Sequence, residues 1–505
     1  MLKRDGANPS VWQGTADPYI VKNKTGKKEF DIAIAGGGIT GITTALILQE
    51  AGFSCVILES ETVCFGTTSG TTAHINTLLD VPYSTLSKNF GEENAALVRS
   101  CVAEALLFIE KNVYTYNADC GFKLQDAFLF ASEEAQLKEL DEIMEASEKA
   151  GIELMEAESI PVPVPFLKAM RADGQARFHP IRYVHALANA FEEAGGVIVE
   201  MSRVLEVEEN EKVQVRTTGG DYFCNHLIYA THTPPGINFL HTRLVPYRSY
   251  AMAVTLEDEL YPDHLTYDMY DPYHYYRTQV IDGRSYLIVG GKDHKTGKEA
   301  NTEACFLALE AHIRKYFPVR EVMYKWSSQY YESVDGLPYI GFLPGKERTL
   351  VATGFGGNGM IYSSVAALVL RDILLGKEHA AVKLFDPSRI KPVAGFTEFV
   401  KHNTGAVKEL LKKLIPVQSI DVVAEMAPGE GRLVQYEGEK LGLYKDEQGM
   451  LHAVLPSCSH MHCDVQWNGT EKSWDCPCHG ARYAPNGDLL NGPSTAPLKT
   501  IRLAD

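Results

Sequence analysis

The sequence predicts α/β and α+β domains followed by a smaller C-terminal domain. Two apolar runs, 31–36 and 54–58, flank a segment with helical spacing at 39–51, and together they make one βαβ unit. Short strand-like runs separated by turn residues follow at 204–208, 212–217 and 226–230. These runs predict an antiparallel layer beside the βαβ unit. Near the C-terminal end, four cysteines alternate with histidines, which indicates a third, metal-binding unit.

Length and composition limit the class of protein. With 505 residues the chain exceeds one ordinary core, and about 150 residues per domain gives roughly three units. A formal net charge of −17 disfavours nucleic acid as a partner. The longest apolar helical run, around 363–375, contains Arg371 and is too short to span a bilayer. Because the first residues also lack the apolar run of a secretory signal, we expect a cytoplasmic protein without a membrane span.

The change in composition along the chain suggests domain limits. Charged amphipathic helices are expected between about 95 and 170, and an aromatic, strand-like stretch suited to walling an organic substrate occupies about 245–330. We expect an N-terminal extension at 1–29, a nucleotide-binding domain from 30–95, 175–240 and 330–385, a substrate domain from 96–174 and 241–329, a linker at 386–417 and a C-terminal domain at 418–505.

A dinucleotide-binding motif lies in the βαβ unit. Gly36, Gly38 and Gly41 form G-x-G-x-x-G between a strand and a helix, where glycine lets the backbone approach a pyrophosphate. Glu59 ends the next strand, at about the spacing expected for a carboxylate that binds a ribose hydroxyl. The alternative is a glycine-rich turn in a fold that binds no nucleotide.

Five further segments carry a family resemblance. They are GITGITTALILQEAGFSCVILES (38–60), GTTSGTTAHINT (66–77), HLIYATHTP (226–234), DGLPYIGFLPG (335–345) and TLVATGFGGNGM (349–360). Over about residues 30–385 the chain resembles the D-amino-acid-oxidase-like family of FAD enzymes, which includes glycine oxidase and sarcosine oxidase. The resemblance implies a Rossmann-like FAD-binding domain, an antiparallel-sheet substrate domain, and oxidation of a C–N bond of an amine or amino acid.

The same resemblance implies which residues contact FAD. It places the loop residues Thr68, Ser69, Thr72, Ala73 and His74 along the flavin and the backbone of Val204 at the adenine. His74 departs from the glycine often found there in the family. Its role is therefore open between a hydrogen-bonded loop histidine and a catalytic or covalent contact with the flavin.

A second glycine motif, at Gly354, Gly356 and Gly359, also opens a helix. No strand ending in an acidic residue follows, so the ribose half of an NAD site is missing. The resemblance instead implies a helix N-terminus facing the flavin pyrimidine ring, where its positive end would stabilise reduced, anionic flavin. The residues implied at this helix N-terminus are Gly357, Asn358, Gly359 and Met360.

The remaining candidate catalytic residues come from the aromatic segment and from one loop. Tyr276 and Arg277 follow Tyr275, and an arginine there could hold a substrate carboxylate through two hydrogen bonds. A surface salt bridge is the alternative for Arg277. His232 replaces a glycine common in the family and joins His74 as a catalytic candidate.

The C-terminal cysteines and histidines have the spacing C-x-H-x15-C-x2-H. Cys458, His460, Cys476 and His479 match a Rieske [2Fe-2S] centre, in which thiolates hold one iron and imidazoles the other. The alternative is zinc, but zinc fingers usually place both cysteines in one hook, whereas each hook here carries one cysteine and one histidine. The segment closely resembles cytochrome bc1-type Rieske proteins, which implies an all-β domain.

That resemblance also implies details around the cluster. Cys463 and Cys478 occupy the positions that form a disulfide in those proteins, and Gly492 and Pro493 resemble the third loop over the cluster. Tyr483 is kept, but Ala481 replaces a serine of the high-potential relatives. Because one hydrogen bond to the bridging sulfide is then missing, we expect a lowered potential.

These observations predict an FAD-dependent dehydrogenase. An amine or amino acid would reduce FAD, and the cluster would pass the electrons to an external acceptor that the sequence does not identify. Two alternatives stay open: a non-catalytic flavin and iron–sulfur carrier or sensor, and an O2-using amine oxidase with a structural Rieske domain. A Rieske oxygenase would need an additional two-histidine, one-carboxylate iron site, for which we expect no domain after the cluster motif.

Overall fold

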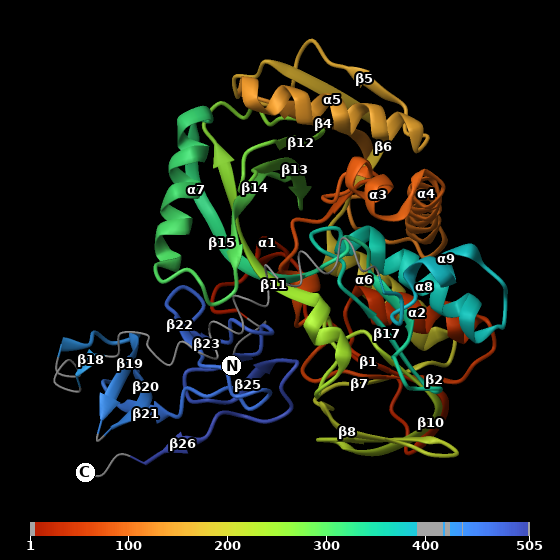
Figure 1. Ribbon diagram of the computed structural model, residues 1–505, viewed down its shortest axis with the longest axis vertical. Coiled ribbons are helices and arrows are strands. Elements are labelled where there is room, and N and C mark those ends of the chain that lie inside the picture. The colour runs from red at the N-terminus through yellow and green to blue at the C-terminus, as the bar shows by residue number, and fades with distance from the viewer. Residues whose placement is uncertain (1–5, 391–417, 420–424, 437, 503–505) are drawn as a thin grey trace.

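Two large sheets and a smaller β domain make up the computed structural model, which describes residues 6–390, 418–419, 425–436 and 438–502 (Figure 1). The first sheet has the order β16-β17-β10-β1-β2-β7. The strands in this order are β16 (Tyr339–Phe342), β17 (Thr349–Thr353), β10 (Gly220–Tyr229), β1 (Glu29–Ala35), β2 (Cys55–Leu58) and β7 (Val197–Val199), and two further strands join the sheet beside β10. Neighbours are parallel except β16 and β17. The predicted βαβ unit is therefore confirmed.

The predicted antiparallel layer forms, but as a continuation of the first sheet. β8 (Val204–Glu209) and β9 (Val213–Thr217) do pair antiparallel, and β9 pairs antiparallel with β10. However, β10 also pairs in parallel with β1, so all three strands belong to the first sheet. Alternating apolar residues predict the strands themselves but not which neighbour each strand takes, because pairing depends on distant segments.

Helices cover the first sheet and connect it to the second. The described helices are α1 (Val11–Gly14), α2 (Ile39–Glu50), α3 (Tyr83–Phe90), α4 (Glu92–Thr115), α5 (Glu134–Lys149), α6 (Pro180–Glu193), α7 (Thr302–Tyr316), α8 (Gly359–Leu374) and α9 (Ala380–Phe385), with 3-10 turns at Thr67–Ser69 and Phe239–Arg243. α2 is apolar along most of its length and nine of its residues are buried. It packs against α6 and α8, which fixes its N-terminus beside the glycine-rich turn.

The second sheet has the order β15-β11-β14-β13-β12-β4-β6-β3, with β5 paired to β6. Its strands are β15 (Val319–Ser333), β11 (Leu244–Leu256), β14 (Arg284–Lys295), β13 (Tyr275–Ile281), β12 (Leu265–Asp268), β4 (Lys123–Ala131), β6 (Lys168–Arg177), β3 (His74–Ile75) and β5 (Leu154–Glu156). α7 packs against β11, β14 and β15. Since β3 comes from the segment 30–95, one strand of the second sheet lies within the predicted nucleotide-binding domain.

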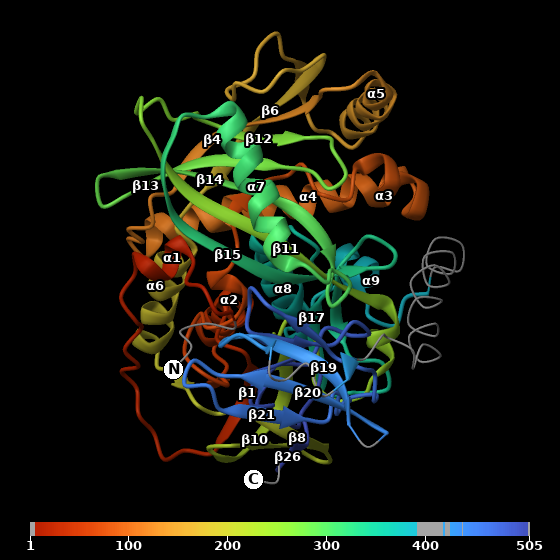
Figure 2. The ribbon, with the colours of Figure 1, turned by 90° about the vertical axis from the view of Figure 1, so that its left-hand side faces the viewer.

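The C-terminal domain is all-β, as predicted. A five-stranded sheet and a four-stranded sheet make it up. The first contains β18 (Gln418–Ser419), β19 (Gly431–Tyr436), β20 (Glu439–Lys445), β21 (Leu451–Val454) and β26 (Thr500–Ile501), and the second contains β22 (Gln466–Asn468), β23 (Ser473–Asp475), β24 (Arg482–Tyr483) and β25 (Leu489–Asn491). Figures 1 and 2 both place this domain beside the ends of β11 and β15. Most of the predicted linker lies outside the described residues, and the domain limits stay a prediction.

The N-terminal extension packs against the rest of the chain. Trp12, in α1, is fully buried, and its indole nitrogen donates to the carbonyl oxygen of Thr71 at 2.6 Å.

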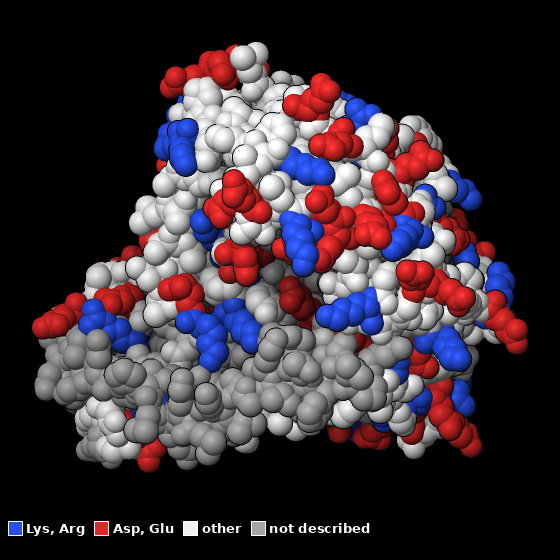
Figure 3. Space-filling model, turned by 45° about the horizontal axis from the view of Figure 1, so that its top comes forward, with Lys and Arg blue, Asp and Glu red and all other residues white. Residues whose placement is uncertain are grey.

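Acidic and basic side chains are interspersed on the face of the molecule that Figure 3 shows. Among the described helices, none combines the length and apolar character needed to cross a bilayer.

Candidate functional site

A large cavity lies between the two sheets. It is lined by residues at the carboxyl ends of β1, β2, β10 and β17, where ligands bind in open α/β sheets, and by side chains of β11 to β15. The cavity has a volume of about 300 Å³, at the lower end of the range of ligand-binding cavities. The predicted residues that line it are Gly36, Gly38, Glu59, Thr68, Thr72, His74, Val204, His232, Gly357, Asn358, Gly359 and Met360.

The first glycine motif leaves the backbone open at the N-terminus of α2. Gly36 has φ +109°, and a Cβ on it would lie 2.5 Å from the carbonyl oxygen of Ala230. Gly38 is the N-cap, and no side chain caps the helix in its place. The Ile39 amide donates to Thr68 Oγ1 at 3.0 Å. A pyrophosphate fits such a cradle because the backbone is bare and the helix end is positive.

Glu59 lies beside this turn and is buried. Its carboxylate accepts hydrogen bonds from the amides of Gly37, at 2.6 Å, and Glu61, at 2.9 Å. Burial raises the pKa of Glu59, although these bonds favour its charged form. The carboxylate therefore has the position at the end of β2 that a ribose-binding group requires.

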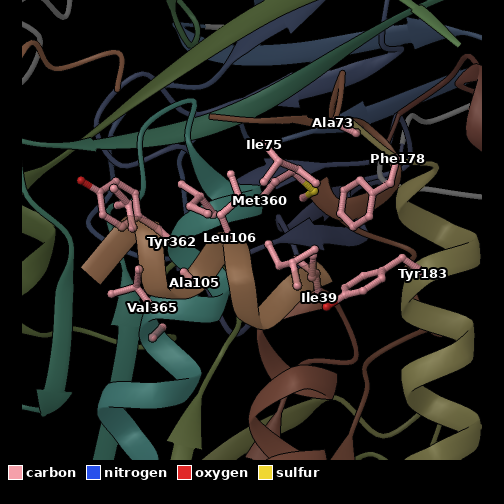
Figure 4. Packing of buried hydrophobic residues seen from close by; sticks show 14 of the residues in the cluster. Ile39, Ala73, Ile75, Ala105, Leu106, Phe178, Tyr183, Met360, Tyr362 and Val365 are labelled. Atoms are coloured by element: carbon pink, nitrogen blue, oxygen red, sulfur yellow. The ribbon is translucent and has the colours of Figure 1, made fainter. Parts of the chain in front are cut away.

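Three predicted cofactor-binding residues do not line the cavity. Gly41 packs against the turn, where a Cβ would come 1.9 Å from the carbonyl oxygen of Gly36. The Ser69 hydroxyl donates to the carbonyl oxygen of Gly66. Ala73 belongs to an apolar core cluster that also contains Ile39 and Met360 (Figure 4). These three residues support the cavity wall from behind and do not line the cavity.

The N-terminus of α8 lies at the cavity, as predicted. Asn358 is the N-cap, but its side chain does not cap the helix. Instead, its Oδ1 accepts from the Asp80 amide at 2.8 Å, and its Nδ2 donates to Asp80 Oδ1 at 3.2 Å. The amides of the first turn consequently have no side-chain cap, which suits a helix end directed at a flavin ring.

His74 and His232 both line the cavity. His74 Nδ1 lies 3.2 Å from Thr72 Oγ1, whereas its buried Nε2 has no hydrogen-bond partner. Burial, together with the charge of Arg277, lowers the pKa of His74 well below 6.5, so its imidazole is neutral. His232 Nδ1 lies 3.1 Å from Thr67 Oγ1, and its ring packs edge-on against Tyr331 at 4.7 Å.

Tyr276 and Arg277 do not line the cavity, which contradicts their predicted roles. Tyr276 faces α7, where its hydroxyl lies 2.5 Å from His312 Nε2. Arg277 is fully buried behind the loop. Its guanidinium donates to the carbonyl oxygens of Thr72 at 2.9 Å and Ala73 at 2.5 Å. Arg277 therefore supports the loop and does not bind a substrate carboxylate.

Tyr275, which the sequence analysis named beside Tyr276 and Arg277, lines the cavity. Residues that the sequence did not single out also line it: Tyr267, Tyr273 and Asp293 from the aromatic stretch, and Asp80 from an earlier loop. Alternation along β13 turns Tyr275 toward the cavity and Tyr276 away from it, since successive side chains of a strand point to opposite faces. The alternation of side chains along the strand could have predicted these orientations, but only if it were known which face of the sheet borders the cavity.

The predicted iron ligands converge in the C-terminal domain. Cys458 and Cys476 are buried, and a hydrogen bond from the Cys476 thiol lowers the pKa of Cys458. The rings of His460 and His479 lie 5.0 Å apart, and Nδ1 of each is buried without a hydrogen-bond partner. Burial lowers the pKa of both histidines. Two thiols and two neutral imidazoles with free nitrogens fit the ligand set of a Rieske cluster.

The residues around these ligands also agree with the resemblance. Cys463 and Cys478 form the implied disulfide. The Tyr483 hydroxyl lies 3.1 Å from Cys458 Sγ and accepts from the Ser459 amide at 3.2 Å. Ala481 is fully buried and has no hydroxyl to offer a sulfide.

The cluster-binding loops are docked on the cavity wall. Tyr331, on β15, donates from its hydroxyl to the carbonyl oxygen of His479 at 3.1 Å. Beside it, Gln329 Nε2 donates to the carbonyl oxygen of Gly480 at 2.9 Å. The third loop lies at the cavity itself, which is lined by Leu490, Asn491, Gly492, Ser494 and Thr495.

A second group of possible metal ligands lies apart from both sites. The ligand atoms of Asp268, His274 and His312 lie within 4.8 Å of one another. The two histidine rings are stacked, 3.7 Å apart and 7° from parallel, and His274 Nδ1 lies 2.7 Å from Asp268 Oδ2. A metal ion bound to a histidine nitrogen lies near the plane of that ring. Because the two rings are stacked, one ion cannot lie near the planes of both. This geometry does not form the iron site of a Rieske oxygenase.

Comparison with known families agrees with this geometry. A family model described as DAO, FAD dependent oxidoreductase, matches residues 31–373. The chain belongs to this family. A second model, described as Rieske [2Fe-2S] domain, matches residues 417–502. The FAD-dependent amine or amino-acid oxidoreductase type, the Rieske domain and the two cofactors, FAD and a [2Fe-2S] cluster, are thereby confirmed.

Individual relatives show how far the similarity extends. The chain is 33% identical over 501 residues to a Rieske 2Fe-2S iron-sulfur protein, YhfW, of Bacillus subtilis (strain 168), with 98% of each chain covered. It is 24% identical over 364 residues to gamma-glutamylputrescine oxidoreductase of Escherichia coli (strain K12), covering 68% of this chain and 84% of the relative. The structure of glycine oxidase from Geobacillus kaustophilus matches with a TM-score of 0.62 at 19% identity, covering 72% of this chain and all of that one.

Proposed function

We propose that this enzyme oxidises a C–N bond of an amine or amino acid and passes the electrons through its Rieske cluster to an external acceptor. Bound FAD supplies two-electron oxidation, and the [2Fe-2S] cluster supplies one-electron transfer. The chain would hold the substrate in the cavity between the sheets. It would also hold the cluster at a fixed place on the cavity wall.

We assign the predicted cofactor residues at the cavity to FAD. Gly36 and Gly38 leave the α2 N-terminus open to the pyrophosphate, Glu59 binds ribose, and Val204 meets the adenine. The loop residues Thr68, Thr72 and His74 and the α8 residues 357–360 contact the flavin. His74 and His232, which line the cavity, are the residues we assign as catalytic candidates.

The observation that carries the proposal is the contact of both cluster histidines with the flavin-binding part. His460 Nε2 donates to the carbonyl oxygen of Gly236 at 3.2 Å, next to Pro235 of the cavity wall. The hydroxyl of Tyr331 donates to the carbonyl oxygen of His479, and the ring of Tyr331 packs against His232 of the cavity wall. Two short routes thus join the flavin cavity to the cluster ligands, which a merely structural domain would not need.

Removing the cluster tests this function. Cys476→Ser removes one iron ligand, and Cys305→Ser, outside the C-terminal domain, is the matched control. In anaerobic rapid mixing with substrate, Cys476→Ser should bleach the flavin at near the unaltered rate and then lose the later transfer of electrons to the acceptor. Cys305→Ser should keep both phases.

The alternatives predict other outcomes. Acceptor turnover that survives loss of the cluster would make the Rieske domain structural, and stoichiometric peroxide release would favour an oxidase. No flavin bleaching with any amine or amino acid would favour a redox carrier or sensor.

A further inference from the structure

Two carboxylates line the cavity near the second sheet, where Asp293 is half-buried and Asp80 is exposed. Asp293, on β14, accepts hydrogen bonds from Ser249 Oγ at 2.5 Å and from the Tyr330 hydroxyl at 2.8 Å. Asp80 hydrogen-bonds to Asn358, as described above. Removal from water raises the pKa of Asp293, and the charge of Asp80 raises it further. The hydrogen-bond donors to both carboxylates are neutral, and within the described chain neither carboxylate forms an ion pair with Lys or Arg.

Aromatic rings surround these carboxylates. Tyr267, Tyr273 and Tyr275 line the cavity, and the rings of Tyr273 and Tyr275 lie 5.6 Å apart. The ring of His74 lies 5.3 Å from that of Tyr267, and neither His74 Nε2 nor the buried Tyr267 hydroxyl has a partner. Aromatic faces and carboxylates attract an organic cation.

This part of the cavity has, among the described residues, no Lys or Arg side chain that could bind a substrate carboxylate. Of the described residues that line the cavity, Arg203 is the one Lys or Arg, and it lies beside Val204, paired with Glu61 at 3.2 Å. Arg277 is committed to the loop carbonyls. An amino-acid carboxylate would therefore meet Asp80 and Asp293 without a compensating guanidinium, whereas proteins usually bind carboxylates through Arg.

We propose that the ligand of this part of the cavity is a cationic amine without a carboxylate on the carbon that bears the nitrogen. Asp293 and Asp80 provide the negative charge, and the tyrosine rings provide the walls. This inference rests on the proposed function and narrows its substrate class from amines or amino acids to amines alone.

Matched pairs of ligands test the class directly. Each pair is an amine and the amino acid that carries the extra carboxylate: 1,4-diaminobutane with ornithine, 1,5-diaminopentane with lysine, and phenethylamine with phenylalanine. Dissociation constants are measured anaerobically on the holoenzyme from the change in flavin absorption and from thermal stabilisation. At least one amine should bind ten or more times as tightly as its partner. Equal affinity in all pairs, tighter amino acids, or no binding by any amine would overturn the inference.

Binding is measured separately from flavin reduction, so the two proposals can fail independently. Amines that bind but never bleach the flavin would contradict the proposed function and leave the ligand class supported. Asp293→Asn should weaken amine binding at least tenfold and reduce the preference over the amino acid. Asp119→Asn, at an exposed aspartate outside the cavity, is the control and should change neither. An unchanged amine affinity in folded, FAD-bound Asp293→Asn would also overturn the inference.

Discussion

His460 Nε2 donates a hydrogen bond to the carbonyl oxygen of Gly236 at 3.2 Å, across 224 positions of the chain. Because Nε2 carries the proton, Nδ1 is left with a lone pair, and that atom is buried without a partner. Such a bond orients a ligating imidazole and raises its basicity. One contact therefore both prepares an iron ligand and fixes the cluster loop on the wall of the flavin cavity.

Tyr331→Phe should slow electron transfer between the two cofactors. The change removes the hydroxyl that donates to the His479 carbonyl oxygen and keeps the ring that packs on His232. Since one buried neutral hydrogen bond is worth about 0.5 to 1.5 kcal/mol, we expect looser docking and a several-fold slower second phase in rapid mixing. The rate of flavin bleaching and the EPR signal of the reduced cluster should not change. Tyr114→Phe, at an exposed tyrosine, is the control, and an equal effect of both changes would refute the interpretation.

The cluster potential should respond in opposite directions to two substitutions. Tyr483→Phe removes the hydroxyl 3.1 Å from Cys458 Sγ, so the reduced cluster loses a stabilising hydrogen bond and the potential should fall. Ala481→Ser adds a hydroxyl next to the cluster loop and should raise the reduction potential of the cluster. Each shift should be about tens of millivolts, because only the difference between oxidation states counts. Redox titration followed by EPR measures both, and shifts of the same sign would contradict the model.

The sequence predicted the parts of this enzyme whose chemistry is local. The turn from Gly36 to Gly41 and the four iron ligands each need fixed residue types at short spacing, so a single segment reveals them. Asp80 and Asp293 come from distant segments with no motif of their own, and they meet only because Asn358 and the second sheet place them in one cavity.

Docking of the Rieske domain was also invisible in the sequence. Gly236 lies in a loop and Tyr331 on β15, and nothing in the sequence near them marks them as partners of a cluster. Tyr276 and Arg277 were misplaced for a related reason. An arginine beside tyrosines suggests a binding site, but the tertiary fold turns one side chain toward α7 and buries the other behind the loop.

Arg277→Lys should reduce stability rather than alter substrate specificity. Arg277 donates to the carbonyl oxygens of Thr72 and Ala73, and an ammonium cannot reproduce the planar fork of a guanidinium. Unsatisfied buried groups cost about 1 to 3 kcal/mol each, so the melting temperature should fall by several degrees and FAD should be held less firmly. Thermal unfolding and flavin content measure the effect. If the variant is stable and only its KM is raised, Arg277 binds the substrate and this interpretation is wrong.

Amine binding should weaken as the pH falls below about 6. Burial raises the pKa of Asp293 to about 6 and that of Asp80 to about 6, so both lose their charge in mildly acidic solution. The ligand keeps its charge there, since an alkyl ammonium has a pKa of about 10. Asp293 faces Ser249, Tyr330 and the charge of Asp80, and burial lowers the pKa of the nearby His74.

The sign of this dependence follows from which form binds. The carboxylate binds a cation and the carboxylic acid does not, so the dissociation constant should rise with falling pH, by up to about tenfold per pH unit for each carboxylate that must be ionised. Titration of the holoenzyme with 1,4-diaminobutane between pH 5 and 8 measures the slope. Asp293→Asn should bind weakly at every pH and show a shallower slope, because one of the two titrating groups is gone. Affinity that is constant or that increases toward pH 5 would show that neither carboxylate holds the ammonium.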